Sequence, residues 1–289
     1  MGKSEDKVKY KSNKKGTAMM IVGIAVVVLL VVFIIFGTSI TDFFRNVFSK
    51  SADDASSGDE ISSSATDTGD SGSQTDGDES SDNGYPENET QLSPDYQLAA
   101  PTAGDPIAII NTSLGTMKFK LFPENAPKAV ENFSTKAKAG YYDGMKFINL
   151  YEDVLQSDGD MDTIYGEGFE REFSINLHNY LGALGVCNSG EGNTSSNQFY
   201  IVTQKEVADD IIEAMSGEQA QSLGLGFSQE VIGKYDTFGG DPTLDGQFAV
   251  FGQMYEGLEV IDLINAVQVD DNYTPLQDIT ITSIEIGTY

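Results

Sequence analysis

An uncharged run of 23 residues, from Ala18 to Ile40, sets the strongest limit on what this chain can fold into. A helix of that length, at ~1.5 Å per residue, spans the ~30 Å hydrocarbon core of a bilayer, which predicts one transmembrane helix with the lipid bilayer as its partner. Six lysines lie in residues 1–17, whereas Arg45 and Lys50 follow the run. The positive-inside rule therefore places residues 1–17 in the cytoplasm as a basic tail, and everything after residue 40 outside the membrane.

A cleaved signal peptide is the alternative interpretation of residues 18–40. Its apolar region would be unusually long, and Thr38-Ser39-Ile40-Thr41 lacks a small-x-small cleavage signature. The uncleaved anchor is favoured, which predicts a single-pass protein of the cell membrane with an extracytoplasmic C-terminal domain.

Residues 41–104 indicate an acidic linker rich in Ser and Asp. Residues 51–100 hold 13 acidic side chains and no basic one. So little apolar surface cannot offset the entropy lost on ordering, and we expect a disordered spacer that holds the next domain clear of the membrane. Calcium capture by the acidic run is the weaker alternative, because flexible carboxylates provide no preformed cage.

The remaining composition excludes several classes of function. The formal net charge is −28, and phosphate binding needs clustered Lys and Arg, so nucleic acid is not expected as a partner. The chain has one cysteine, Cys187, and one histidine, His178. This leaves no zinc site and little basis for histidine-dependent catalysis, so we expect neither a metal nor a cofactor. His178 is expected at the surface.

The segment 105–289 has the pattern of a globular domain in which strands outnumber helices. Apolar and alternating runs predict strands within residues 107–122, 197–204, 246–254 and 279–286. Short turns between many strands favour an antiparallel barrel or sandwich closed by two helices.

Two helices are expected, at residues 127–139 and 256–267. Asn125 is a plausible cap for the first, and Pro127 suits its first turn. Apolar residues at helical spacing predict the buried faces, namely Val130, Phe133, Ala137, Val260, Leu263, Ile264 and Val267.

Four blocks in order, at residues 112–147, 165–173, 182–202 and 244–264, resemble the cyclophilins, a family of peptidyl-prolyl isomerases. The resemblance implies a mainly β fold, an eight-stranded antiparallel β-barrel with a helix closing each end. It also implies an outer groove that binds polypeptides containing Xaa-Pro.

An insert at residues 205–243 departs from the family pattern. It carries an expected helix from Glu206 to Met215, and similar inserts occur in cyclophilins of Gram-positive bacteria, which suits an anchored, outward-facing protein. The insert could shape the rim of the groove or only decorate it. Decoration is slightly favoured, because loops tolerate insertions.

Rotation about an Xaa-Pro bond needs no covalent step, although its barrier is ~18–20 kcal/mol. An enzyme needs an apolar pocket for the proline ring and a donor for the nitrogen of the twisted amide. In the family that donor is an arginine, and the resemblance puts Asn149 at its position. Asn149 and Gln198 are the expected catalytic residues, while Arg171 falls outside the catalytic positions and is expected at the surface. A neutral donor is weaker than a charged one, so the activity is expected to be low.

The resemblance also assigns the substrate-binding positions. Ser157 replaces the groove glutamine of the family, and the neighbouring Gln156 is expected to point to the other face of its strand. Phe199 is expected in the core. The expected groove residues are Val154, Leu155, Ser157, Cys187, Asn188, Tyr200, Leu244 and Phe248.

Two functions are compatible with these residues. The first is an isomerase that assists the folding of exported proteins outside the membrane. The alternative is a non-catalytic module, a holdase or scaffold, that binds proline-containing peptides on the same fold. Asn149 argues for the alternative, whereas the retained Gln198, Tyr200 and Asn188 fit both, and the family resemblance favours the isomerase.

Overall fold

The computed structural model describes residues 85–86, 88–151, 153–160, 162–188 and 194–289. The predicted basic tail at 1–17, the predicted transmembrane helix at 18–40 and the linker up to residue 84 lie outside this part. Within the described part, no helix has the length and apolar character needed to cross a bilayer.

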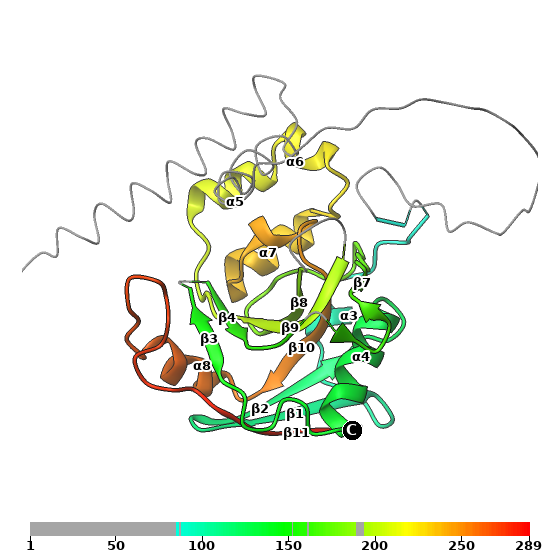
Figure 1. The fold of residues 1–289 in the computed structure, drawn as a ribbon. Helices are drawn as coiled ribbons and strands as arrows, with labels where there is room; N and C mark the ends of the chain where they lie inside the picture. The colour runs from blue at the N-terminus through cyan, green and yellow to red at the C-terminus, as the bar shows by residue number, and fades with distance from the viewer. Residues whose placement is uncertain (1–84, 87, 152, 161, 189–193) are drawn as a thin grey trace, which may run out of the picture. The chain divides into compact units, whose positions relative to one another are not determined.

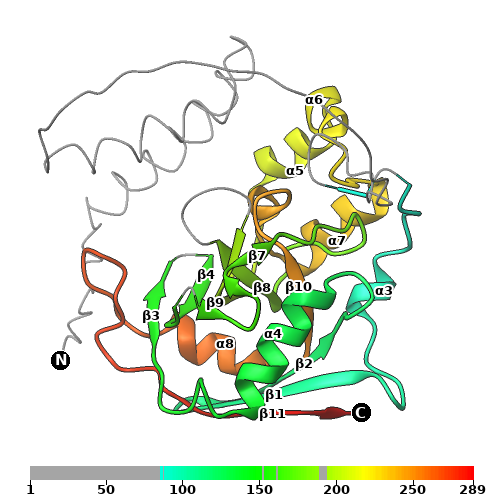
Figure 2. The same cartoon turned by 45° about the vertical axis from the view of Figure 1, so that its right-hand side comes forward.

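An antiparallel sheet forms most of the domain and curls into a half-barrel (Figures 1 and 2). Its strands follow the order β11-β1-β2-β10-β8-β9-β4-β3, and β7 pairs with β9. The bounds are β1 Pro106–Thr112, β2 Gly115–Leu121, β3 Phe147–Leu150, β4 Val154–Ser157, β7 Phe169–Glu170, β8 Ala183–Asn188, β9 Thr194–Val202, β10 Val250–Glu256 and β11 Ile281–Thr288. A separate hairpin pairs β5 Asp162–Thr163 with β6 Gly166–Glu167.

The two outer strands of this order, β3 and β11, approach each other at one end. Lys146 and Thr280 form an isolated bridge, and the backbone N–H of Phe147 donates to the carbonyl of Ile279 at 2.9 Å. The expectation of a mainly β antiparallel fold is therefore confirmed. In place of the expected closed eight-stranded barrel, the structure shows an antiparallel sheet that curls into a half-barrel.

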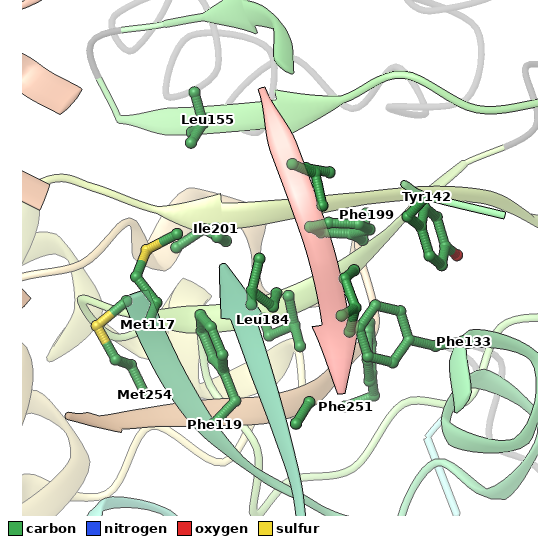
Figure 3. Packing of buried hydrophobic residues seen from close by; sticks show 14 of the residues in the cluster. Met117, Phe119, Phe133, Tyr142, Leu155, Leu184, Phe199, Ile201, Phe251 and Met254 are labelled. Carbon is green, nitrogen blue, oxygen red and sulfur yellow. The ribbon is translucent and has the colours of Figure 1, made fainter. Parts of the chain in front are cut away.

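The concave face of the sheet holds the main core (Figure 3), and two helices contribute residues to it. Helix α4 runs from Pro127 to Lys138, close to the predicted bounds, and helix α8 from Leu258 to Asn265. Phe133 of α4 lies 5.4 Å from the ring of Phe199 and 5.1 Å from that of Phe251. The expected buried face of α4 is confirmed.

The expected buried face of α8 is wrong at Leu263, which is 52% exposed. Ile261 is buried in its place, beside Val260 and Ile264. Val260 and Ile264 are buried as predicted, and Val267 is partly buried against the main core, so the buried face differs from the predicted one only in having Ile261 in place of Leu263.

Glu172, and not Asn125, caps the start of helix α4. Its carboxylate oxygens accept from the backbone N–H groups of Lys128 and Ala129, each at 3.0 Å. A carboxylate suits these unpaired donors and the positive end of the helix dipole. The side chain of Asn125 is engaged elsewhere, accepting from the hydroxyl of Tyr96 at 2.5 Å.

The ordered domain begins earlier than the predicted boundary at residue 105, so the linker assignment is wrong for its last part. Tyr85 is 4% exposed and stacks on Phe173 at 5.3 Å between ring centroids. Helix α3, Asp95–Leu98, buries Gln97, whose side chain donates to the carbonyl of His178 at 2.7 Å and accepts from its N–H at 2.8 Å. These contacts supply the stabilisation that composition alone does not reveal.

The insert forms three helices where one was expected. These are α5 Asp209–Met215, α6 Glu218–Ser222 and α7 Gln229–Phe238, followed by a 3-10 helix at Pro242–Leu244. The three helices gather on the side of the sheet that carries β8 and β9 (Figures 1 and 2). They enclose an insert cluster of buried residues that also includes Tyr180 from the segment before β8, namely Tyr180, Met215, Phe227, Val231, Ile232 and Tyr235.

Candidate active site

A single row of residues crosses four neighbouring strands on the outer face of the sheet. Asn149 on β3 pairs with Gln156 on β4, Gln156 pairs with Tyr200 on β9, and Tyr200 pairs with Gly185 on β8. Residues paired across a sheet point to the same face. The row therefore joins two of the predicted site residues, Asn149 and Tyr200, through Gln156.

Three side-chain amides form a hydrogen-bonded chain along this row, which we call the amide ladder. The Nδ2 group of Asn149 donates to Oε1 of Gln156 at 3.2 Å, and Nε2 of Gln156 donates to Oε1 of Gln198 at 3.4 Å. All three side chains are half-buried. Within the described part of the chain, nothing accepts from Nε2 of Gln198, so the ladder ends in an available N–H donor.

The inner face of β4 takes two residues that the sequence analysis assigned to the groove. Leu155 is fully buried in the main core, and Ser157 is fully buried with its hydroxyl accepting from the backbone N–H of Phe199 at 2.9 Å. Both assignments are wrong, and the interpretation of Gln156 as facing away from the groove is wrong as well. Strict alternation from Val154 puts Val154 and Gln156 on one face and Leu155 and Ser157 on the other.

An apolar group next to the amide ladder, which we call the outer cluster, is separate from the main core. It brings together five of the predicted binding residues with neighbours from β8, β9 and β10. Its members are Phe122, Leu177, Ala183, Cys187, Tyr200, Val202 and Val250, with Tyr96, Val154, Leu244 and Phe248 packed against them.

Tyr200 lies at the base of the outer cluster. The residue is 2% exposed, and its ring meets that of Phe248 edge-on at 5.7 Å between centroids. The ring lies so close to β8 that a Cβ at Gly185 would come within 2.1 Å of it. Only glycine leaves room for the ring there. Its hydroxyl donates to Oδ1 of Asn179 at 2.6 Å, and burial raises the pKa of Tyr200 well above its usual value.

The outer cluster and the amide ladder can together bind an apolar ring and donate a hydrogen bond beside it. Half-exposed apolar side chains of Val154, Leu244 and Phe248 can contact an apolar ring, and the N–H of Gln198 can donate to a polar atom beside that ring. The described residues hold no group of three His, Cys, Asp or Glu side chains placed to bind a metal.

Comparison with known proteins identifies the family. The model of the cyclophilin type peptidyl-prolyl cis-trans isomerase/CLD family matches residues 107–286. The chain belongs to the cyclophilin-type peptidyl-prolyl cis-trans isomerases. The family is one of peptidyl-prolyl isomerases, and the non-catalytic alternative is therefore not favoured.

Two curated proteins that are similar to this isomerase come from staphylococci. A Staphylococcus aureus (strain USA300) protein named "Putative peptidyl-prolyl cis-trans isomerase" is 40% identical over 190 residues, covering 63% of this chain and 92% of its own. A Staphylococcus epidermidis protein of the same name is 38% identical over 185 residues, covering 62% and 90%. A crystal structure of a Cryptosporidium parvum cyclophilin type isomerase aligns with a TM-score of 0.49 and 23% identity, covering 64% of this chain and 99% of that one.

Cys187 and Asn188 of the isomerase lie together at the end of β8, as expected. Cys187 is 7% exposed, and burial raises the pKa of its thiol to about 12, so the thiol is not a nucleophile at neutral pH. The side chain of Asn188 donates from Nδ2 to the carbonyl of Gln247 at 3.1 Å. The structure thus connects β8 to the turn that carries Leu244 and Phe248.

Two residues that were expected at the surface lie beside this same turn. Arg171 is half-buried and donates from a guanidinium nitrogen to the carbonyl of Gln247 at 3.0 Å. His178 is 1% exposed, with Nδ1 2.8 Å from Oδ2 of Asp245. The surface expectation is wrong for His178, which Gln97 of the N-terminal segment and Phe227 and Tyr235 of the insert cover, whereas Arg171 remains partly exposed. Asp245, buried between two groove positions, was not singled out from the sequence.

Proposed function

We propose that this isomerase acts outside the membrane on exported polypeptides, anchored by residues 18–40, and that it catalyses through neutral amides in place of an arginine. The observation that carries the catalytic part is the amide ladder, which ends in the donor of Gln198 beside the outer cluster. The anchoring part rests on the uncharged run and on the excess of lysine before it.

The reaction follows from the two halves of the site. The outer cluster binds the proline ring through Val154, Leu244 and Phe248, above the ring of Tyr200. As the Xaa-Pro bond twists, amide resonance is lost and the proline nitrogen regains its lone pair. Nε2 of Gln198 donates to this nitrogen or to its flanking backbone, and the transition state is bound more tightly than either planar isomer.

The upstream members of the ladder strengthen the terminal donor. Each amide that accepts a hydrogen bond becomes a better donor at its own N–H, so the bonds from Asn149 to Gln156 and from Gln156 to Gln198 act in the same direction. Asn149, at the position where the family resemblance puts arginine, thus acts on the substrate through the ladder. The absence of a formal charge predicts a rate below that of an arginine-bearing site.

The catalytic part is tested by Gln198→Leu in the full chain, measured by NMR exchange of a proline peptide. Loss of a donor that acts in the transition state is expected to lower kcat on the order of 10²-fold. Gln268→Leu, at an exposed position after α8, is the matched control. Full activity of Gln198→Leu would overturn the assignment.

The anchoring part is tested by protease treatment of intact cells that express the chain. Cleavage within residues 41–84 that releases the isomerase domain into the medium is the expected result. A domain that is protected until the membrane is permeabilised would place it in the cytoplasm and overturn the proposed location.

A further inference from the structure

We propose that the insert at residues 205–243 is a positioning element of the isomerase site, and that Tyr235 on helix α7 does the positioning. It does so by holding the turn from Leu244 to Phe248, which forms one wall of the outer cluster. This role rests on the proposed function, and it belongs to a segment that contributes no residue to the amide ladder or the outer cluster.

Asp245 is the point at which the insert meets this turn. It lies between Leu244 and Gly246, is 6% exposed, and its Oδ2 accepts from the hydroxyl of Tyr235 at 2.8 Å. Oδ1 accepts from the backbone N–H and the side-chain amide of Asn179, at 2.9 and 2.7 Å. Oδ2 also lies 2.8 Å from Nδ1 of His178. A buried carboxylate with this many short contacts is held in one place, and the loss of one hydrogen bond weakens that hold.

The same contacts reach the base of the outer cluster. Asn179 accepts from the hydroxyl of Tyr200 at 2.6 Å while its N–H groups donate to Asp245. A continuous chain therefore runs from Tyr235 through Asp245 and Asn179 to Tyr200. Through Asp245, the hydroxyl on α7 is thus connected to both a wall and the base of the site where the proline ring binds.

Packing of the insert reinforces the contact. Leu225, between α6 and α7, lies against Gly246 so closely that a Cβ there would come within 2.8 Å of its methyl group. The positive φ of +78° at Gly246 also favours glycine. Tyr235 itself is fully buried, with its ring 4.6 Å from that of Tyr180.

Tyr180 offers a matched control for Tyr235. Both tyrosines are fully buried in the insert cluster, and their rings touch. The hydroxyl of Tyr180, however, has no hydrogen-bond partner in the described part of the chain, whereas that of Tyr235 donates to Asp245. Replacing each with phenylalanine removes a hydroxyl from the same environment, but only the replacement of Tyr235 removes a hydrogen bond from Asp245, which then keeps its contacts with Asn179 and His178.

The experiment compares Tyr235→Phe and Tyr180→Phe in the full chain, with kcat and KM obtained by NMR exchange over a series of Ala-Pro-Phe peptide concentrations. A wall that binds the ring equally in the ground and transition states affects KM and not kcat. Tyr235→Phe is expected to raise KM about fivefold with kcat within about twofold, while Tyr180→Phe leaves both unchanged. Equal KM values for the two variants would overturn the inference.

Two further measurements separate positioning from stability and from the proposed function. Ile264→Val in α8, whose side chain belongs to the main core and not to the insert cluster, is expected to lower stability and must leave KM unchanged at temperatures well below unfolding. Peptide affinity is titrated in parallel from shifts of the protein signals. If the wild-type chain failed to accelerate exchange, the proposed function would fail, and a fivefold weaker affinity of Tyr235→Phe would still support the inference.

Discussion

Gln156 lies directly across from Tyr200 in the pairing of β4 with β9, which puts the middle amide of the ladder beside the ring at the base of the outer cluster. The polar and apolar halves of the site therefore share one line across the sheet. Strand register sets the position of Gln156 relative to Tyr200, and the turn that carries Leu244 and Phe248 completes the apolar half.

Replacing Gln156 with leucine tests the ladder at its centre. The apolar side chain keeps the volume but removes both hydrogen bonds, so that Asn149 and Gln198 lose their shared partner. If the hydrogen bond from Gln198 stabilises the transition state by about 1 kcal/mol less, kcat falls about fivefold with little change in KM. Activity equal to that of the wild type, measured by NMR exchange, would argue that Gln198 acts without the ladder.

A positive charge at position 149, where the amide ladder begins, is expected to raise kcat. Asn149→Arg puts a guanidinium next to Gln156 on the outer face of β3. Charge-assisted hydrogen bonds are about twice as strong as neutral ones, and we expect an increase in kcat of about tenfold or more. An unchanged kcat in the same exchange assay would contradict the placement of Asn149 at the donor position.

Gly185→Ala tests the base of the outer cluster. Its new methyl group would lie 2.1 Å from the ring of Tyr200, so the ring or the strand must move. We expect peptide affinity to fall at least about tenfold and stability to fall by about 1–3 kcal/mol. Gly233→Ala in α7 is the control, since a Cβ there meets nothing within 4 Å, and its urea unfolding is expected to match or exceed that of the wild type.

The sequence predicts the fold more closely than the faces of individual strands. Ordered motif blocks identify the family, and helical spacing places Val130 and Phe133 of α4 correctly. Leu155 and Ser157 are assigned to the wrong face because motif matching ignores the alternation that places Val154 and Gln156 together. Alternation alone supplies the missing signal at that strand.

Other parts of the site depend on contacts between distant segments. His178 and Asp245 are 67 residues apart, and Tyr235 comes from an insert whose packing has no sequence signature. Glu172 caps a helix that begins 45 residues before it. These partners are set by tertiary packing, which local patterns do not encode.

A carboxyl pair near the outer cluster predicts a pH dependence of stability. Burial, followed by a hydrogen bond with Asp153 and its charge, raises the pKa of Asp241 to about 8, while an unfolded aspartate titrates at 3.8. The folded chain therefore holds one more proton between these values, and its stability falls as the pH rises from about 4 to about 8. The slope within this window is about 1.4 kcal/mol per pH unit for one proton.

The variant that checks this dependence is Asp241→Asn. Asparagine keeps the Oδ1 acceptor for the backbone N–H of Thr243 at 2.9 Å. Its side-chain N–H group takes the place of the carboxyl O–H that is hydrogen-bonded to Asp153 in the protonated aspartic acid. The difference in Tm between variant and wild type is expected to grow in favour of the variant from pH 5 to pH 9. Asp236→Asn, at an exposed position on α7, should show a constant difference.

Truncation tests the revised start of the domain. A chain that begins at residue 105 loses the burial of Tyr85 and the hydrogen bonds of Gln97 to His178, which a chain that begins at residue 85 retains. Loss of roughly 3 kcal/mol predicts a Tm about 6–12 °C lower for the shorter chain. Equal Tm values by calorimetry would restore the boundary at residue 105.

The most direct test of the account is the rate of cis/trans exchange of an Ala-Pro-Phe peptide, measured by NMR with and without the full chain at micromolar concentration. Uncatalysed exchange takes tens to hundreds of seconds at 25 °C. The account predicts exchange at least about tenfold faster, and its return to the uncatalysed rate with Gln198→Leu. Peptide signals that shift on titration while exchange stays at the uncatalysed rate would contradict catalysis by neutral amides.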